Sequence, residues 1–193
     1  MIRTALFLLA LCVLAVPARA EEALRWRAAL AGGRVSEKHF AGVSNPGVAV
    51  VGGEIGRAFM NFMEFGYAFS YAGIVRTDDL TAVQTGYDVT FHSLFADFLF
   101  DRTDRGFYAG PQLGIVSRSL RGAASGASLN SASFGARAGY NQPLGGAFSA
   151  GLQAQYLFVG AAKNTVTVNS VNNTYSAPRT SFAKYLLLLN YKF

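Results

Sequence analysis

The C-terminal segment constrains the fold more than any other part of the chain. Counting back from the last residue, every second position carries a large apolar or aromatic side chain: Phe193, Tyr191, Leu189, Leu187 and Tyr185. The positions between them are Lys192, Asn190, Leu188, Leu186 and Lys184. A period of two places the two sets on opposite faces of an extended strand. The segment therefore predicts a strand with one wholly apolar face, and about 9–11 such residues suffice to cross a bilayer.

The N-terminus has the layout of a secretory signal peptide. Arg3 gives a short positive region, residues 5–16 form an unbroken apolar run, and Ala18-Arg19-Ala20 follows Pro17 as a small-x-small cleavage site. The apolar run is too short for a membrane-spanning helix, which needs about 18 residues or more. We expect cleavage after Ala20, so that residues 1–20 are the signal peptide and residues 21–193 form one exported domain. The single cysteine is then removed with the signal peptide.

Composition narrows the class of protein. Charged residues make up 15% of the chain, whereas a soluble domain usually has about a quarter. Beyond residue 20 there is nevertheless no apolar run of the length of a transmembrane helix. High apolar content without such a run is typical of a membrane β-barrel, because only every second strand residue must face lipid. The basic residues are spread along the chain, and no Lys/Arg-rich run indicates nucleic-acid binding.

Eight alternating segments predict an all-β fold, a closed antiparallel transmembrane β-barrel with up-and-down topology. The predicted strands are residues 24–34, 47–56, 59–75, 85–100, 107–119, 131–142, 147–159 and 181–193. Short and long connections alternate between them, as periplasmic turns and external loops do in such barrels. A count of ten strands is the alternative. In the fourth segment the alternation slips near His92-Ser93-Leu94, and a β-bulge there would restore it.

Three segments carry a resemblance to a known family. They are Phe107-Tyr108-Ala109-Gly110-Pro111-Gln112-Leu113-Gly114, the strand Phe134–Tyr140 and the terminal Tyr191-Lys192-Phe193. Together with the signal peptide they resemble the OmpA-like, opacity-type family of small outer-membrane β-barrels, over essentially the whole exported chain. The resemblance implies a Gram-negative outer-membrane location. We expect the barrel alone, without a peptidoglycan-binding domain, because the sequence ends at the terminal strand.

The alternation that ends in a terminal Phe also looks like the signal read by the outer-membrane assembly machinery. That likeness implies the machinery as a partner during biogenesis. The residues of the signal are Tyr185, Leu187, Leu189, Tyr191 and Phe193.

The interior of an eight-stranded barrel is just wide enough for its own side chains. Charged groups inside it must therefore pair or draw in water. We expect these residues to point inward: Arg25, Arg27, Glu64, Asp88, Asp97, Arg137, Gln153, Gln155 and Lys184. We interpret them as a plug of ion pairs and hydrogen bonds. The alternative is a narrow pore gated by one of these pairs.

The external strand ends are basic. Arg118 and Arg121 lie at the third long connection, and Arg and Lys suit phosphate groups. The hypothesis is that these two residues contact lipopolysaccharide, and ordinary loop solubility is the alternative. We therefore expect outer-membrane lipid and lipopolysaccharide as partners, with an external ligand as a further possibility.

The preferred function is a structural or surface-interaction role in envelope integrity, adhesion or lipopolysaccharide contact. A porin-like channel for ions or small solutes is the second candidate, and a lipid A-modifying enzyme is the third. His92 and Ser93 are the only adjacent pair suited to such an enzyme, and consecutive strand residues point to opposite faces. We therefore expect no enzymatic activity, no catalytic or metal site and no cofactor. A soluble carrier with its apolar residues inside is the fourth reading, and the scarcity of charge on the polar face argues against it.

Overall fold

The computed structural model describes residues 26–39, 44–59, 62–77, 84–100, 106–120, 128–168 and 171–193. The predicted signal peptide, Arg25 and Arg121 lie outside these residues. Ten strands occupy the described part: β1 (Trp26–His39), β2 (Ser44–Phe59), β3 (Met63–Thr77), β4 (Gln84–Leu99), β5 (Gly106–Leu120), β6 (Ser128–Gly145), β7 (Phe148–Val159), β8 (Ala162–Val168), β9 (Val171–Ala177) and β10 (Thr180–Lys192). Among the described residues there is no helix of the length and apolarity that a membrane span requires.

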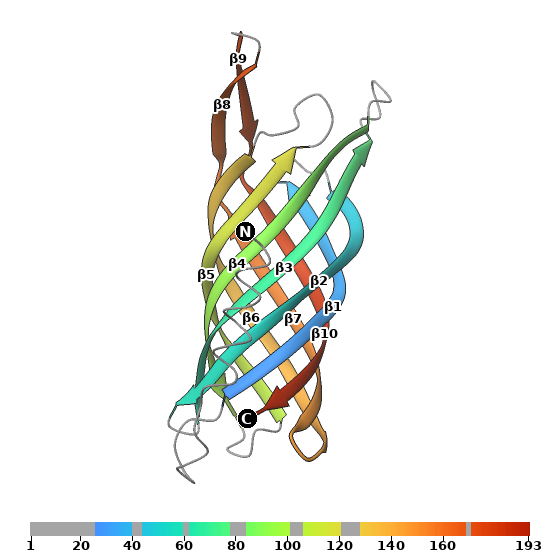
Figure 1. The fold of residues 1–193 in the computed structure, drawn as a ribbon, viewed down its shortest axis with the longest axis vertical. Helices are drawn as coiled ribbons and strands as arrows, with labels where there is room; N and C mark the ends of the chain where they lie inside the picture. Colours follow the sequence, from blue (N-terminus) through green and yellow to red (C-terminus); the bar gives the residue numbers. More distant parts are fainter. Residues whose placement is uncertain are drawn as a thin grey trace.

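Eight of these strands close into one antiparallel barrel in the order β1-β10-β7-β6-β5-β4-β3-β2 (Figure 1). The predicted fold class, strand number and up-and-down topology are confirmed. Each barrel strand corresponds to one predicted segment. The largest single difference is at the end of the first, which β1 extends from residue 34 to His39, and the turn between the second and third is shifted as well. There β2 continues to Phe59 and β3 begins only at Met63. The sequence has no turn signal at residues 57–59, so the alternation of the strand continues through them.

Strand pairing fixes the stagger of the barrel. Starting at Ala28 and stepping each time to the paired residue on the next strand, the path around the barrel returns to β1 at Lys38. The paired residues on the seven strands between are Ile55, Tyr67, Leu94, Leu113, Phe134, Phe158 and Ser181. The circuit therefore closes ten residues further along β1. A stagger of this kind requires strands that are tilted from the barrel axis, by about 35–45° in barrels of this kind. In Figure 1 the strands run obliquely across the barrel.

Alternate residues face outward and inward along every barrel strand. The outer face is apolar: the exposed fractions of Leu30, Leu113 and Leu187 are 71%, 65% and 65%. Phe182, which points into the barrel, is fully buried. A closed sheet that turns its leucines outward is stable only where that surface meets hydrocarbon. The soluble-carrier alternative is thereby excluded, and the chain is a transmembrane β-barrel.

Aromatic side chains ring the end of the barrel that carries the short turns. Phe107 and Tyr140 lie with ring centroids 4.9 Å apart, and Phe148 and Tyr191 lie 5.0 Å apart. Trp26 and Phe193 exchange two backbone hydrogen bonds of 3.0 Å where the first and last barrel strands meet. Amphipathic rings concentrate at membrane–water boundaries, so this rim marks one surface of the bilayer.

The remaining two strands, β8 and β9, form a separate two-stranded sheet. The hairpin continues from β7 and leads back into β10, and Figure 1 shows it projecting beyond the rim opposite the aromatic ring. Asn164 Nδ2 donates a hydrogen bond of 2.7 Å to the carbonyl of Ser128 at the start of β6. That contact ties the base of the hairpin to the barrel.

Candidate functional site inside the barrel

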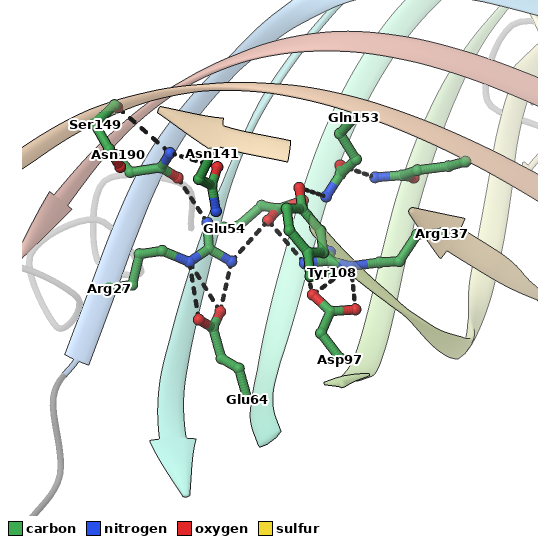
Figure 2. Close-up of polar contacts among 11 residues, drawn as sticks. Arg27, Glu54, Glu64, Asp97, Tyr108, Arg137, Asn141, Ser149, Gln153 and Asn190 are labelled. Atoms are coloured by element: carbon green, nitrogen blue, oxygen red, sulfur yellow. Dashed lines mark hydrogen bonds and ion pairs between the residues drawn. The ribbon is translucent and has the colours of Figure 1, made fainter. Parts of the chain in front are cut away.

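The barrel interior is filled by two kinds of side chain. Near the aromatic rim it holds a network of charged and amide groups, most of which are drawn in Figure 2. Nearer the opposite rim it holds an apolar cluster that includes Val35, Val50, Phe91, Leu157 and Phe182. In both layers these side chains are buried by the other groups of the interior.

Arg27 organises one half of the polar network. Its Nε donates to both carboxylate oxygens of Glu64 at 2.9 and 3.1 Å, and its Nη2 lies 2.5 Å from Glu64 Oε1. Nη2 also reaches Glu54 Oε2 at 3.2 Å, and Nη1 donates to Asn190 Oδ1 at 2.8 Å. The planar guanidinium thus satisfies two carboxylates and an amide from three other strands, as its fixed fork of donors allows.

Arg137 organises the other half in the same way. Its Nε and Nη2 form a bidentate pair with Asp97 at 2.6–3.0 Å. Its Nη1 and Nη2 bind the two carboxylate oxygens of Glu54 at 3.0 and 3.2 Å. The guanidinium carbon lies 3.5 Å from the ring centroid of Phe95 and 5.8 Å from that of Tyr108. Glu54 therefore bridges the two arginines, as Figure 2 shows.

Glycine makes room for this network at the inner wall of β2. A Cβ atom placed on Gly56 would lie 2.1 Å from Oε1 of Glu64. A methyl group cannot occupy that position without displacing the carboxylate that binds Arg27. The lack of a side chain at Gly56 is therefore part of the site.

A second group of cations lies above the network. Lys184 Nζ donates to Ser70 Oγ at 3.1 Å and lies 4.1 Å from the ring centroid of Phe91. Phe91 meets Phe182 edge to face at 5.1 Å, and the Arg118 guanidinium lies 5.6 Å from the Phe182 centroid. Two aromatic rings thus separate two cations along the interior, and each cation faces the negative π-cloud of a ring.

The buried charges balance. Among the described residues, the buried cations are Arg27, Arg118, Arg137 and Lys184, and the buried carboxylates are Glu37, Glu54, Glu64 and Asp97. Four positive and four negative groups leave no formal excess inside. Burial of an uncompensated charge is expensive, so the balance is what a stably filled interior requires.

Most residues expected inside do lie there. Arg27, Glu64, Asp97 and Arg137 form the network, and Lys184 stands above it. Gln153 and Gln155 are buried beside it, where Gln155 Nε2 donates to Gln153 Oε1 at 2.5 Å and Gln153 Nε2 donates to Tyr108 Oη at 3.0 Å.

Asp88 is a correction. It lies on the outer face of β4, where Tyr71 Oη donates to its carboxylate at 2.5 Å. The expected bulge near His92 is absent, since β4 pairs with β3 in unbroken register from Gln84 to Phe98. Positions 88 and 97 differ by an odd number, so a regular strand must turn Asp88 and Asp97 to opposite faces.

Arg118 is a second correction, and it overturns the expected lipopolysaccharide contact of that residue. Arg118 is buried inside the barrel, where it donates to Ser131 Oγ at 3.3 Å and to Thr180 Oγ1 at 2.6 Å. The reason is again parity: Gln112, Val116 and Arg118 occupy one set of alternate positions in β5, and all three are buried inside. A residue's position near the external end of a strand does not determine whether its side chain points into or out of the barrel.

Glu54, Asn190 and Tyr108 are members of the network that sequence reasoning missed. A usable signal was present for Glu54, because it is the only charged residue in 47–56 and lies in phase with Val50. No comparable signal marked Asn190 and Tyr108, which belong to strands whose inner faces also contain leucine and glycine.

No side chains suited to metal binding or to nucleophilic catalysis converge in the described residues. No group of three or more His, Cys, Asp or Glu side chains there could hold a metal ion. His92 points outward, where its Nδ1 lies 2.6 Å from Tyr67 Oη, while Ser93 is buried on the inner side. The two residues therefore cannot act together.

Comparison with solved structures identifies the fold. Neisserial surface protein A matches with a TM-score of 0.67 at 14% identity, over 89% of this chain and all of that one. Ail of Yersinia pestis, solved in complex with the heparin analogue sucrose octasulfate, matches at 0.56 and 10% identity over 89% and 100%. The outer membrane protein OprG of Pseudomonas aeruginosa matches at 0.55 and 11% identity over 86% and 95%.

These matches agree with the prediction of a small outer-membrane barrel, and at such low identity they establish the fold alone. No protein-family profile matches the sequence, and no curated protein matches it either. The chain has the fold of the small eight-stranded outer-membrane β-barrels.

Proposed function

We propose that this protein is a closed, non-conducting outer-membrane barrel whose role is structural at the membrane and interactive at the cell surface. The observation that carries the proposal is the filled interior. An ion path would have to cross the Arg27–Glu54–Arg137 network and then the apolar cluster around Phe91 and Phe182. Eight strands leave no room for a second path beside these groups.

The narrow channel is the competing function, and opening the ionic network alone would not create it. The apolar cluster stands in series with the network, and its buried apolar side chains give water few hydrogen-bond partners. Recording in planar bilayers separates the two functions: the reconstituted protein is expected to show no stable openings. Reproducible single-channel openings, recorded at voltages too low to break down the bilayer itself, would overturn the proposal.

The interaction surface that we propose is the β8–β9 hairpin. The hairpin is paired from Ala162 and Ala177 to Val168 and Val171 and is held at its base by Asn164. Thr165 and Thr174 bridge its two strands through their hydroxyl groups at 3.1 Å. A rigid β-hairpin that protrudes from the barrel can present its edges or side chains to a partner at low entropic cost.

The surface role can be tested by removing the hairpin without disturbing the barrel. Ala162 and Ala177 are directly paired, so an Asn-Gly turn placed between them should close the shortened hairpin. Cells that display equal amounts of folded wild-type or shortened barrel are compared for autoaggregation and for adhesion to heparin-coated and uncoated surfaces. Loss of any of these properties in the shortened form supports the proposal. Equal behaviour in every assay would leave the barrel with a membrane-structural role only.

A further inference from the structure

The outer face of β1 carries two exposed cations near the rim opposite the aromatic ring. Arg34 and Lys38 lie four positions apart on the same face of the strand, and both are exposed. Exposed Arg179 directly precedes β10, which pairs with β1. Lys38 pairs with Ser181, which follows Arg179 by two residues in the sequence, so Arg179 lies next to the β1–β10 pair at the same rim.

A bulge in the neighbouring strand orients Arg34. The register of β1 with β2 shifts between Val35 and Glu37, and next to this irregularity the carbonyl of Gly47 accepts a hydrogen bond of 2.9 Å from Arg34 Nη2. The other guanidinium N–H groups of Arg34 have no partner among the described residues. A guanidinium has five N–H donors in one plane, so this anchored side chain keeps several of them for a ligand.

No carboxylate within the described ranges neutralises these cations. Glu37 lies between them in sequence, but it points into the barrel, is buried and accepts a hydrogen bond from Tyr87. Asp88 is the one described carboxylate on the outer face, and it lies on β4, three strands away around the barrel. Within the described part of the chain, Arg34, Lys38 and Arg179 therefore form a positive patch at the rim with no carboxylate beside it.

The surface next to the patch is strongly apolar. Leu30 lies four positions before Arg34 on the same face of β1, and Tyr185 pairs with Arg34 across β10. Their exposed fractions are 71% and 66%, and that of Leu187, the next outward residue of β10, is 65%. The cations thus stand where the lipid-facing band ends. An anion that contacts them while its own apolar part covers Leu30 and Leu187 must be an amphiphile of the membrane.

We propose that Arg34, Lys38 and Arg179 bind the phosphate groups of an outer-leaflet glycolipid of the lipopolysaccharide type, whose acyl chains lie against Leu30, Tyr185 and Leu187. Charge-assisted hydrogen bonds from Arg34 hold one phosphate, and the more compact ammonium of Lys38 completes its neutralisation. Arg179, which directly precedes β10, adds a further positive charge near the same headgroup. The site replaces the contact expected at Arg118. It rests on the outer-membrane orientation within the proposed function but not on whether the barrel conducts.

The test uses the full exported chain refolded in uncharged detergent. Binding is measured for lipid A that carries both phosphates, for the same lipid after dephosphorylation, and for inorganic phosphate. The double variant R34Q/K38Q is compared with R57Q, which removes an outward-facing cation at the opposite rim. Because all three side chains lie on the outside, both variants should fold, and heat-modifiable gel migration verifies this.

The wild-type barrel is expected to bind the phosphorylated lipid at least about tenfold more tightly than the dephosphorylated one, which corresponds to one charge-assisted contact. R34Q/K38Q should lose that preference, R179Q should lose part of it, and R57Q should stay within about twofold of the wild type. Equal affinity for the two lipids, or equal loss in the control variant, would overturn the proposal. Displacement of the lipid by inorganic phosphate at equal concentration would overturn the lipid as the source of the phosphate.

Discussion

Glu54 on β2 faces Arg137 on β6 across the barrel, and Oε1 of Glu54 lies 3.0 Å from Nη1 of Arg137. Oε2 of the same carboxylate lies 3.2 Å from Nη2 of Arg27. One side chain therefore holds two buried guanidinium groups together, and both would be left under-compensated without it. Of the three acids of the network, Glu54 is the one that contacts both guanidinium groups.

Replacing Glu54 with Gln should destabilise the folded barrel by about 3–5 kcal/mol, the usual effect of removing one partner of a buried ion pair. The free energy of unfolding is measured by urea titration of the protein in lipid vesicles. Lys163→Gln serves as the control, because Lys163 is exposed, and a surface change of this kind costs within about 0.5 kcal/mol. Equal stability of the two variants would contradict the bridging role of Glu54.

Gly56→Ala should destabilise the barrel by about 1–3 kcal/mol, because the added methyl group must push Glu64 away from Arg27. Gly32→Ala is the matched control, since a Cβ there meets no atom within 4 Å. On conformational entropy alone that control should be neutral or slightly stabilising. The same unfolding titration compares the two, and a smaller loss at Gly56 than at Gly32 would argue against a tightly fitted network.

Phe182→Ala should cost about 3–5 kcal/mol, as large-to-small changes in a packed core do. Phe182 is fully buried and contacts both the ring of Phe91 and the guanidinium of Arg118. Leu113→Ala on the outer face, where lipid can fill the space, should cost clearly less. Conductance of the Phe182 variant is recorded in parallel and is expected to stay absent, because the ionic network still closes the interior.

Deleting Phe193 should lower the amount of folded barrel in cells while leaving refolding of the purified chain in detergent largely intact. The terminal alternation is expected to be read by the assembly machinery, and the backbone pair that Phe193 forms with Trp26 is one rung among many. Heat-modifiable migration quantifies both. An equal defect in cells and in purified form would assign Phe193 a structural role instead.

His92→Ala and Ser93→Ala are expected to leave the mass spectrum of lipid A unchanged in cells that express the barrel. The side chains lie on opposite sides of β4, with His92 bound to Tyr67 outside and Ser93 buried inside. A lipid A species that disappears in either variant would restore the enzymatic interpretation.

The fold was predictable because the alternation of apolar and polar residues indicates both where the strands lie and that the sheet closes into a barrel. The unclear boundary near Phe59 shifted a turn by a few residues without changing the strand number. The site was less predictable, because one wrong choice between the inward and the outward face also reverses the faces predicted for other residues of the same strand. An assumed bulge reversed Asp88, and a loop-based argument placed Arg118 outside although its strand parity puts it inside. Partners across the lumen, such as Glu54 and Arg137, require the register of several strands at once.

The bridge from Glu54 also bears on how the barrel closes. It joins β2 to β6, while Arg27 on β1 needs Asn190 on the last strand. A sheet that has not yet received β10 would hold these guanidinium and carboxylate groups partly unmatched in hydrocarbon. Partial assemblies are therefore penalised until the final strand docks, and membrane insertion is expected to be an all-or-none event.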